Sequence, residues 1–180
     1  DFAAARRAMV ASQLRTSGIN TPALLDAFGM VAREDYVGPQ RRAVAYVDRS
    51  IPLSPTRAMN PAATTAALIN ALALDDGDTV LVVGAATGYA VAIVARLARM
   101  VVGVECDAAL ANAAKIALPH ATLVVGALEA GAAAHAPYDA ILIDGAVETV
   151  PPALIAQLSA KGRLATGLVD AGVTRLALGR

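Results

Sequence analysis

The sequence predicts an α/β fold built on a mostly parallel sheet. Three observations carry this prediction: short apolar runs recur from residue 79 onward, helical segments alternate with them, and small residues follow the first run. Strands that alternate with helices are typical of βαβ units, whose parallel strands are covered by helices. The 180 residues fit one domain, and the apolar share of 57% supplies a sizeable core.

The first sixty residues are expected to form helices and loops rather than part of this sheet. Residues 3–15 place apolar side chains at helical spacing, and Ser17-Gly18 ends that pattern. Thr21 and Pro22 open a second predicted helix, with Thr21 as its cap. Residues 31–60 contain three prolines and little periodicity, so an irregular connection is expected there.

A further helix is predicted from Asn60-Pro61 to about Ala73, and strands then alternate with helices. The predicted strands, apolar and mostly β-branched, are 79–83, 100–104, 121–125, 138–143, 162–168 and 173–178, with helices at 89–97, 108–118 and 151–158. Residues 79–95 carry no charge but are too few for the roughly 20 that span a bilayer. We divide the chain into an N-terminal helical extension with its connection, 1–60, and an α/β domain, 61–180.

Charge and composition disfavour several classes of function. The formal net charge is zero, so no long-range attraction to nucleic acid or to an anionic membrane is expected. Seven arginines near the start are interpreted as a solvated face, with a weak site for an anionic partner as the alternative: Arg6, Arg7, Arg15, Arg33, Arg41, Arg42 and Arg49. The isolated His120 and His135 are expected at the surface, and no metal site is predicted. A single cysteine and no secretory signal favour a cytoplasmic location.

Small and acidic residues follow the predicted strands. The turn Gly84–Tyr89 follows the first strand, and Glu105 with Cys106 follows the second. Gly126-Ala127 and Asp144-Gly145 follow the third and fourth. Ligands of an open parallel sheet bind beyond the carboxyl ends of its strands, so these residues are expected to line one crevice.

That crevice is suited to a nucleotide. Small residues let the backbone approach a ligand, and a helix N-terminus offers free N–H groups. Glu105, 21 residues after Gly84, can accept hydrogen bonds from both ribose hydroxyls. Each feature also has a purely structural alternative. Gly84 and Gly88 would form a tight turn without a ligand, Glu105 would be a solvated strand end, and Asp144 would be a turn or cap residue. The candidate cofactor-binding residues are Gly84, Ala85, Ala86, Gly88, Tyr89, Glu105, Cys106, Gly126, Ala127 and Asp144.

Several stretches point to a known family in the same order along nearly the whole chain. They are Met9–Arg15 with Gly18-Ile19, Val31–Val37, Ala45–Asp48 with Pro52-Leu53, Val80–Tyr89, Ala136–Asp139, and Leu154–Leu158 with Gly162–Leu164. Through them the sequence resembles the protein-L-isoaspartate O-methyltransferase family of S-adenosylmethionine-dependent enzymes.

The resemblance implies a Rossmann-like methyltransferase three-layer sandwich of seven strands with an N-terminal helical extension. In that division residues 1–60 contain the extension and the substrate-loop region, and residues 61–180 form the S-adenosylmethionine-binding domain. It implies S-adenosylmethionine in the crevice, and methylation of the free carboxyl of isoaspartyl residues in damaged proteins. A carboxylate is already nucleophilic, so catalysis would consist mainly of positioning. The resemblance also implies a final antiparallel strand beyond Leu178, whereas the sequence stops at Arg180, so an open sheet edge is expected.

The substrate segment departs from the family pattern. Residues 57–61 read Arg-Ala-Met-Asn-Pro where the family has Thr-Ile-Ser-Gln-Pro, and Met59 stands at the position of the serine. The catalytic residue is therefore not assigned from the sequence.

The cofactor turn departs as well. Val82 replaces an acidic residue, Ala86 the middle glycine and Ala127 an aspartate, whereas Asp144 is an addition. Each lost hydrogen bond to a charged group costs about 1.5–3 kcal/mol. Two such losses predict a cofactor affinity lower by roughly 100-fold.

These departures leave two classes of function open. The first is the isoaspartyl methyltransferase, or a methyltransferase with another acceptor, which Asp144 would suit by orienting an amine or hydroxyl. The second is a catalytically inactive pseudoenzyme or binding module whose crevice is partly closed by Met59, Val82 and Leu128. A homo-oligomer is a further expectation. Binding of S-adenosylmethionine distinguishes the two classes.

Overall fold

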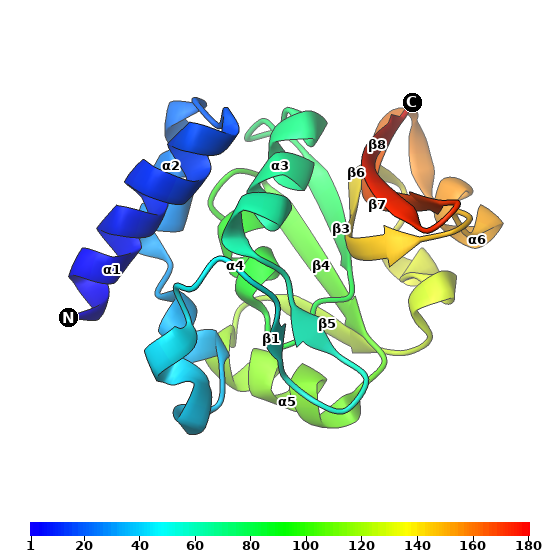
Figure 1. Cartoon of the computed structure of the whole chain (residues 1–180). Coiled ribbons are helices and arrows are strands. Elements are labelled where there is room, and N and C mark those ends of the chain that lie inside the picture. Colours follow the sequence, from blue (N-terminus) through cyan, green and yellow to red (C-terminus); the bar gives the residue numbers. More distant parts are fainter.

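A computed structural model describes all 180 residues and contains a six-stranded sheet flanked by helices (Figure 1). The strands lie in the order β5-β4-β3-β6-β7-β8. Their bounds are β3 Thr79–Val83, β4 Met100–Glu105, β5 Thr122–Val125, β6 Tyr138–Val147, β7 Leu158–Asp170 and β8 Val173–Gly179. All six correspond to predicted strands, which confirms the α/β class. The sheet has one strand fewer than the seven that the family resemblance implies.

The sheet is parallel except at one edge. β3 pairs in parallel with β4 on one side and with β6 on the other, and only β8 runs antiparallel to its neighbour β7. The chain proceeds outward from β3 to β4 and β5 and then returns to the far side of β3. The direction of winding therefore reverses between β3 and β6, where an open sheet of this kind binds its ligands.

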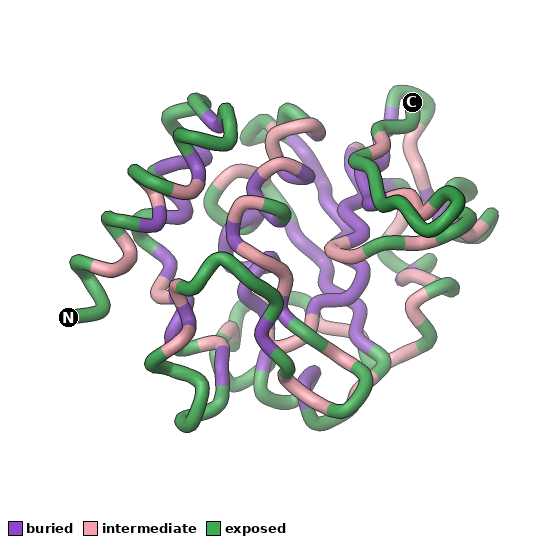
Figure 2. The backbone as a smooth tube through the Cα atoms, viewed as in Figure 1, coloured by how far each residue is buried: buried purple, intermediate pink, exposed green.

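Helices cover the two faces of β3 with separate cores. Val80 and Val82 belong to a large core cluster with residues of the N-terminal helices, whereas Leu81 and Val83 belong to a smaller cluster on the other face. The helices are α3 Ala62–Leu72, α4 Tyr89–Val94, α5 Ala108–Ala117 and α6 Pro152–Ile155. The tube in Figure 2 is buried along the centre of the sheet and exposed along β8.

The N-terminal region packs on this framework as helices and turns. α1, Phe2–Met9, continues through a π-helical turn, Val10–Leu14, and a 3₁₀ turn that ends at Gly18 with φ of 84°. α2, Pro22–Met30, starts as predicted, but the Thr21 side chain does not cap it and instead donates to Asn70 Oδ1 at 2.8 Å. Thr21 therefore occupies the N-cap position, as predicted, but makes no capping hydrogen bond with its side chain.

The connection to α3 contains 3₁₀ turns at Arg33–Tyr36 and Pro39–Val44 and a two-stranded ribbon of β1, Ile51–Pro52, and β2, Ala58–Met59. This agrees with the predicted irregular segment. Residues of this region and of the sheet share the large core cluster, so the two predicted parts of the chain pack together.

Arg33 corrects the expectation of a solvated arginine face. Its side chain is fully buried, donates from Nε to the Ala45 carbonyl at 2.7 Å, and lies 4.8 Å from the centre of the Tyr89 ring. The cation therefore stabilises the junction between the N-terminal segment and α4 instead of facing water.

None of the helices combines the length and apolarity that crossing a bilayer requires. No three His, Cys, Asp or Glu side chains lie close enough together to hold a metal ion. His120 and His135 are exposed, as the sequence predicts.

Candidate functional site

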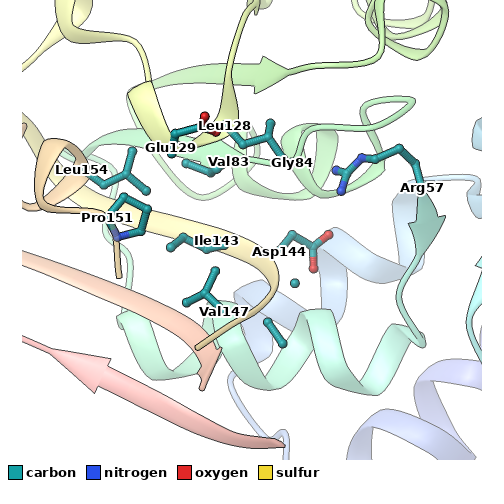
Figure 3. A pocket seen from close by; sticks show the side chains of 12 residues that line it. Arg57, Val83, Gly84, Leu128, Glu129, Ile143, Asp144, Val147, Pro151 and Leu154 are labelled. Carbon is teal, nitrogen blue, oxygen red and sulfur yellow. The ribbon is translucent and has the colours of Figure 1, made fainter. Parts of the chain in front are cut away.

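A cavity of about 240 Å³ opens beyond the carboxyl end of β3, where the pairing of β3 with β6 stops. Val83 at the end of β3 and Gly84 in the following turn line one side of it, and Ile143 and Asp144 line it from β6. Figure 3 shows Arg57 reaching into this space from the neighbouring β2 segment. The cavity lies at the reversal point of the sheet, where the sequence predicts the ligand crevice. Leu128, Glu129, Gly145, Ala146, Val147, Pro151 and Leu154 complete its lining.

The turn after β3 is shaped by left-handed backbone. Gly84 has φ of 82° and Gly88 has φ of 99°, a region that glycine enters without steric cost. A Cβ atom on Gly84 would lie 2.9 Å from Nη2 at the flexible end of the Arg57 side chain, so the positive φ is the stronger requirement for glycine here. Ala86 also has a positive φ, 49°, which an L-residue adopts at some cost in strain.

Glu105 lies directly against this turn. Its Oε2 accepts a hydrogen bond from the Ala86 backbone N–H at 2.7 Å, and its Oε1 accepts from the N–H groups of Cys106 and Asp107, each at 3.0 Å. The carboxyl end of β4 thus places the carboxylate beside the loop between β3 and α4. The sequence predicts this proximity because neighbouring parallel strands end at the same edge of a sheet.

Arg57 pairs with Glu105 through both of its oxygens. Nε donates to Oε1 at 3.1 Å and Nη2 donates to Oε2 at 3.0 Å. The Glu105 residue is only 1% exposed, and the Arg57 side chain is 20% exposed. Burial opposes ionisation of Glu105, but the hydrogen bonds from Arg57 and from the N–H groups of Asp107 and Ala86 outweigh it and lower its pKa. The carboxylate is therefore ionised at neutral pH.

Asp144 faces α3 from the neighbouring strand. Its Oδ1 accepts hydrogen bonds from Asn60 Nδ2 at 2.9 Å and from Thr65 Oγ1 at 3.0 Å. Burial raises the pKa of Asp144, and these hydrogen bonds oppose the rise only in part. Strand β6 continues through this residue to Val147, so the prediction that Asp144 ends the strand is wrong.

The predicted cofactor residues fall into three groups in the structure. Gly84 and Asp144 line the cavity. Ala86, Glu105 and Cys106 lie at the hydrogen-bonded junction beside it, with the Cys106 side chain exposed. The other five do not reach the cavity lining: Ala85, Gly88, Tyr89, Gly126 and Ala127.

Tyr89 packs away from the cavity. It is 3% exposed, and its ring lies edge-on against the rings of Phe28 and Tyr36. Its side chain thus belongs to the contact between α4 and the N-terminal segment. Gly126 and Ala127 follow β5 at the far edge of the cavity, where the next residues, Leu128 and Glu129, form the lining.

Two side chains expected to narrow the crevice are in the core instead. Met59 is 5% exposed and Val82 is fully buried, and both belong to the large core cluster. Of the three residues in that expectation, only Leu128 lines the cavity. The expected obstruction by Met59 and Val82 is therefore wrong.

Sequence reasoning did not assign Arg57, Asn60, Thr65 or Glu129 to the site. Arg57 is 48 positions from Glu105, and Thr65 is 79 positions from Asp144. Residues so far apart form no local pattern. One local signal could have indicated Arg57 as a site residue: it is the only charged residue in the segment 54–59, just before Asn60-Pro61.

The chain was compared with known protein families and sequences. The model of the family described as protein-L-isoaspartate(D-aspartate) O-methyltransferase matches residues 5–173. A protein-L-isoaspartate O-methyltransferase of Methylorubrum populi is 42% identical over 165 residues, which cover 89% of this chain and 78% of that protein. The protein of the same name from a Roseiflexus species is 38% identical over 169 residues, covering 91% and 77%.

Solved structures give the same fold. One protein-L-isoaspartate O-methyltransferase superposes with a TM-score of 0.78 at 23% identity, covering 91% of this chain and 55% of that one. A candidate enzyme of that name from Plasmodium falciparum, in complex with S-adenosyl-L-homocysteine, gives 0.79 at 16% identity, covering 96% and 88%. At these identities the likeness establishes the Rossmann-like methyltransferase fold.

Proposed function

Because the chain belongs to the protein-L-isoaspartate(D-aspartate) O-methyltransferase family, we propose that it methylates isoaspartyl carboxyl groups in damaged proteins, with S-adenosylmethionine as methyl donor. The observation that carries this proposal is the junction of Glu105 with the Gly84–Gly88 turn, beside the cavity between β3 and β6. An ionised carboxylate next to a glycine-bearing turn is suited to a nucleoside with free ribose hydroxyls.

The residues present fit this cofactor. Glu105 supplies the charged acceptor for the ribose, Gly84 leaves room for close approach of the backbone, and Leu128 offers an apolar surface to a base. Asp144 offers a carboxylate to a cationic group. Val82 and its partner Leu142 pack in the core cluster that contains α3, and Asp144 accepts a hydrogen bond from Thr65 of α3, so both acidic positions lie on the α3 side of the sheet. We infer that Asp144 supplies the negative charge that the family carries at position 82.

The chemistry needs little from the chain besides binding and orientation. When bound, S-adenosylmethionine supplies an electrophilic methyl group on a sulfonium: an acceptor carboxylate oxygen bonds to the carbon, the carbon–sulfur bond breaks, and its electron pair stays on sulfur. An ionised acceptor needs no general base. The contribution of the chain is to hold the carboxylate in line and to exclude water, which reduces the entropic part of the barrier.

The two parts of the chain are assigned different roles at the site. We infer that residues 1–60 shape the acceptor side and residues 61–180 hold the cofactor, which the position of Arg57 and Asn60 at the cavity supports. Isoaspartyl proteins or peptides are the proposed partners. A cytoplasmic location is supported by the single cysteine, which excludes an intrachain disulfide. A homo-oligomer stays a prediction.

The binding test uses isothermal titration with S-adenosylhomocysteine. The wild-type protein is expected to bind it, and Glu105→Gln is expected to bind at least about tenfold more weakly, because a charged acceptor for the ribose is lost. Circular dichroism checks that the variant is folded. If the wild-type protein does not bind S-adenosylhomocysteine at millimolar concentration, the proposed function is wrong.

The activity test measures transfer of a radiolabelled methyl group to an isoaspartyl peptide. The matched control is the same peptide with an ordinary aspartyl residue, which has the same composition and charge. Label should enter the isoaspartyl peptide alone and leave as methanol in mild base, as expected of a methyl ester. Equal labelling of both peptides, or of neither, contradicts the proposed acceptor.

A further inference from the structure

The hydrogen-bonding capacity of Glu105 is already filled by the protein itself. Five N–H groups donate to it: two from Arg57 and one each from the backbone of Ala86, Cys106 and Asp107. A carboxylate presents about four lone-pair sites. Two ribose hydroxyls can therefore bind Glu105 only if some of these donors leave.

Arg57 is the donor that can leave. The three backbone N–H groups are fixed by the turn after β3 and by the start of α5, whose N-cap is Asp107. The backbone of Arg57 is also held, since its carbonyl accepts from the N–H groups of Leu53 and Ser54, but its guanidinium is carried on a long flexible stem. It makes two hydrogen bonds to Glu105, the same number that two ribose hydroxyls would make.

The size of the cavity also points to Arg57. Its volume of about 240 Å³ lies below the range of roughly 300–1,000 Å³ that is usual for small-molecule sites. Arg57 lines the cavity beside Gly84, as Figure 3 shows, so a turn of this side chain would enlarge the space next to the cofactor turn.

Charge indicates where the guanidinium would go. Three charged residues line the cavity: the carboxylates of Glu129 and Asp144, and the cation of Arg57. An anionic methyl acceptor is repelled by the first two and attracted only by Arg57. A guanidinium also presents its N–H groups as a fork that matches a carboxylate.

We propose that Arg57 exchanges between two carboxylates: it pairs with Glu105 in the empty site, and it binds the carboxylate of the methyl acceptor once ribose hydroxyls have replaced it on Glu105. Arg57 is thus a specificity-determining residue for an anionic acceptor, and it makes acceptor binding depend on prior cofactor binding. This inference rests on the proposed function, because it takes the cofactor and the acceptor from it.

The test compares wild type, Arg57→Gln and Arg57→Lys in two measurements. In isothermal titration, Arg57→Gln is expected to bind S-adenosylhomocysteine about tenfold more tightly, because the ribose no longer displaces a charged partner of Glu105. In methyl-transfer assays, the KM for the isoaspartyl peptide should rise at least about tenfold, with a smaller change in kcat. Arg42→Gln, at an exposed ion pair with Asp35, is the matched control and should change neither quantity.

Weaker binding of S-adenosylhomocysteine by Arg57→Gln, or an unchanged KM, would overturn the inference. If Arg57→Gln fails to fold, Arg57→Lys decides the matter, since lysine keeps the charge but lacks the fork and should shift both quantities in the same directions. Failure of the proposed function is distinguishable, because in that case no variant binds S-adenosylhomocysteine at millimolar concentration.

Discussion

At the scale of single residues, Asp144 combines a structural cost with a proposed role in binding. Its carboxylate is held by Asn60 and Thr65, and none of the ion pairs in the structure involves it. Burial raises its pKa above the ordinary value. A carboxyl group with a raised pKa in the folded state imposes no penalty below its unfolded pKa and lowers stability as the pH rises through the folded value.

Asp144→Asn is therefore expected to stabilise the fold at pH 8 and to leave it unchanged near pH 3. The amide oxygen can still accept from Asn60 and Thr65, so the packing is retained. The same variant should bind S-adenosylhomocysteine about tenfold more weakly, because the cationic group of the ligand loses a charged partner. Thermal unfolding at the two pH values and titration calorimetry measure these effects. A lower midpoint at pH 8 contradicts the account.

Local sequence rules predicted the position of Glu105 beside the turn but not the partners of the acidic groups. The turn and Glu105 follow adjacent parallel strands, so the topology alone brings them to one edge. Arg57 meets Glu105, and α3 meets Asp144, only through tertiary packing. Val82 stands where the family resemblance implies an acidic cofactor ligand, and its side chain instead fills the core beneath α3 and α4.

At the scale of elements, the start of α4 depends on a close approach to α5. Gly88 precedes α4 with φ of 99°, and a Cβ atom there would lie 2.9 Å from Leu118 Cδ1 and 3.3 Å from Ala114 Cβ. The glycine is therefore required twice, by the backbone conformation and by the space between the two helices.

Gly88→Ala is expected to lower the free energy of unfolding by about 1–3 kcal/mol, since a left-handed L-residue alone costs about 1–2 kcal/mol and α5 must also move. Gly126→Ala is the matched control at another strand end, where φ is not positive and a Cβ atom meets nothing within 4 Å. It should stay within about 0.5 kcal/mol of wild type. Urea denaturation compares the two, and equal losses would refute the packing argument.

The order and type of the sheet elements were predictable because β-branched apolar runs and helical spacing are local signals. Element ends were less predictable. α4 stops at Val94 rather than near Leu97, and β6 runs on past Asp144, because contacts with neighbouring strands and turns decide where pairing ends. The Thr21 hydroxyl donates to the side chain of Asn70, 49 positions away, and makes no capping hydrogen bond to α2.

At the scale of the whole molecule, Arg163 of β7 connects several separate elements. Its Nη2 pairs with Asp78 at 2.6 Å and also donates to the Ala73 carbonyl, while its Nη1 donates to the Asp139 carbonyl. Nε donates to the Leu72 carbonyl at the end of α3. One cation thus connects four elements: the C-terminus of α3, the residue before β3, the start of β6, and β7.

Arg163→Ala is expected to lower the free energy of unfolding by about 3–5 kcal/mol, because Asp78, only 6% exposed, is left without its charged partner. Arg42→Ala removes a pair whose side chains are 46% and 57% exposed, and should cost less than about 1 kcal/mol. Chemical denaturation of both variants provides the comparison. Similar losses would show that Arg163 adds no more than a surface charge.

The α/β class and its parallel order could be predicted from the alternation of elements, but the joining of the N-terminal segment to the sheet could not. One core cluster includes residues as far apart in sequence as Met9 and Ala165, and Arg33 is fully buried although the scattered arginines around it predict a solvated face. Such burial depends on distant carbonyl groups, which leave no trace in the local pattern.

The hydrogen bonds that hold Glu105 determine which neighbouring residues can be substituted during evolution. Three of its hydrogen bonds come from main-chain N–H groups, which every residue except proline provides. Mutations at those three positions can accumulate without displacing the acid, provided that the loop keeps its path. The side chains around the site can therefore change one at a time, and with them the ligand specificity, while the Glu105 carboxylate keeps its position.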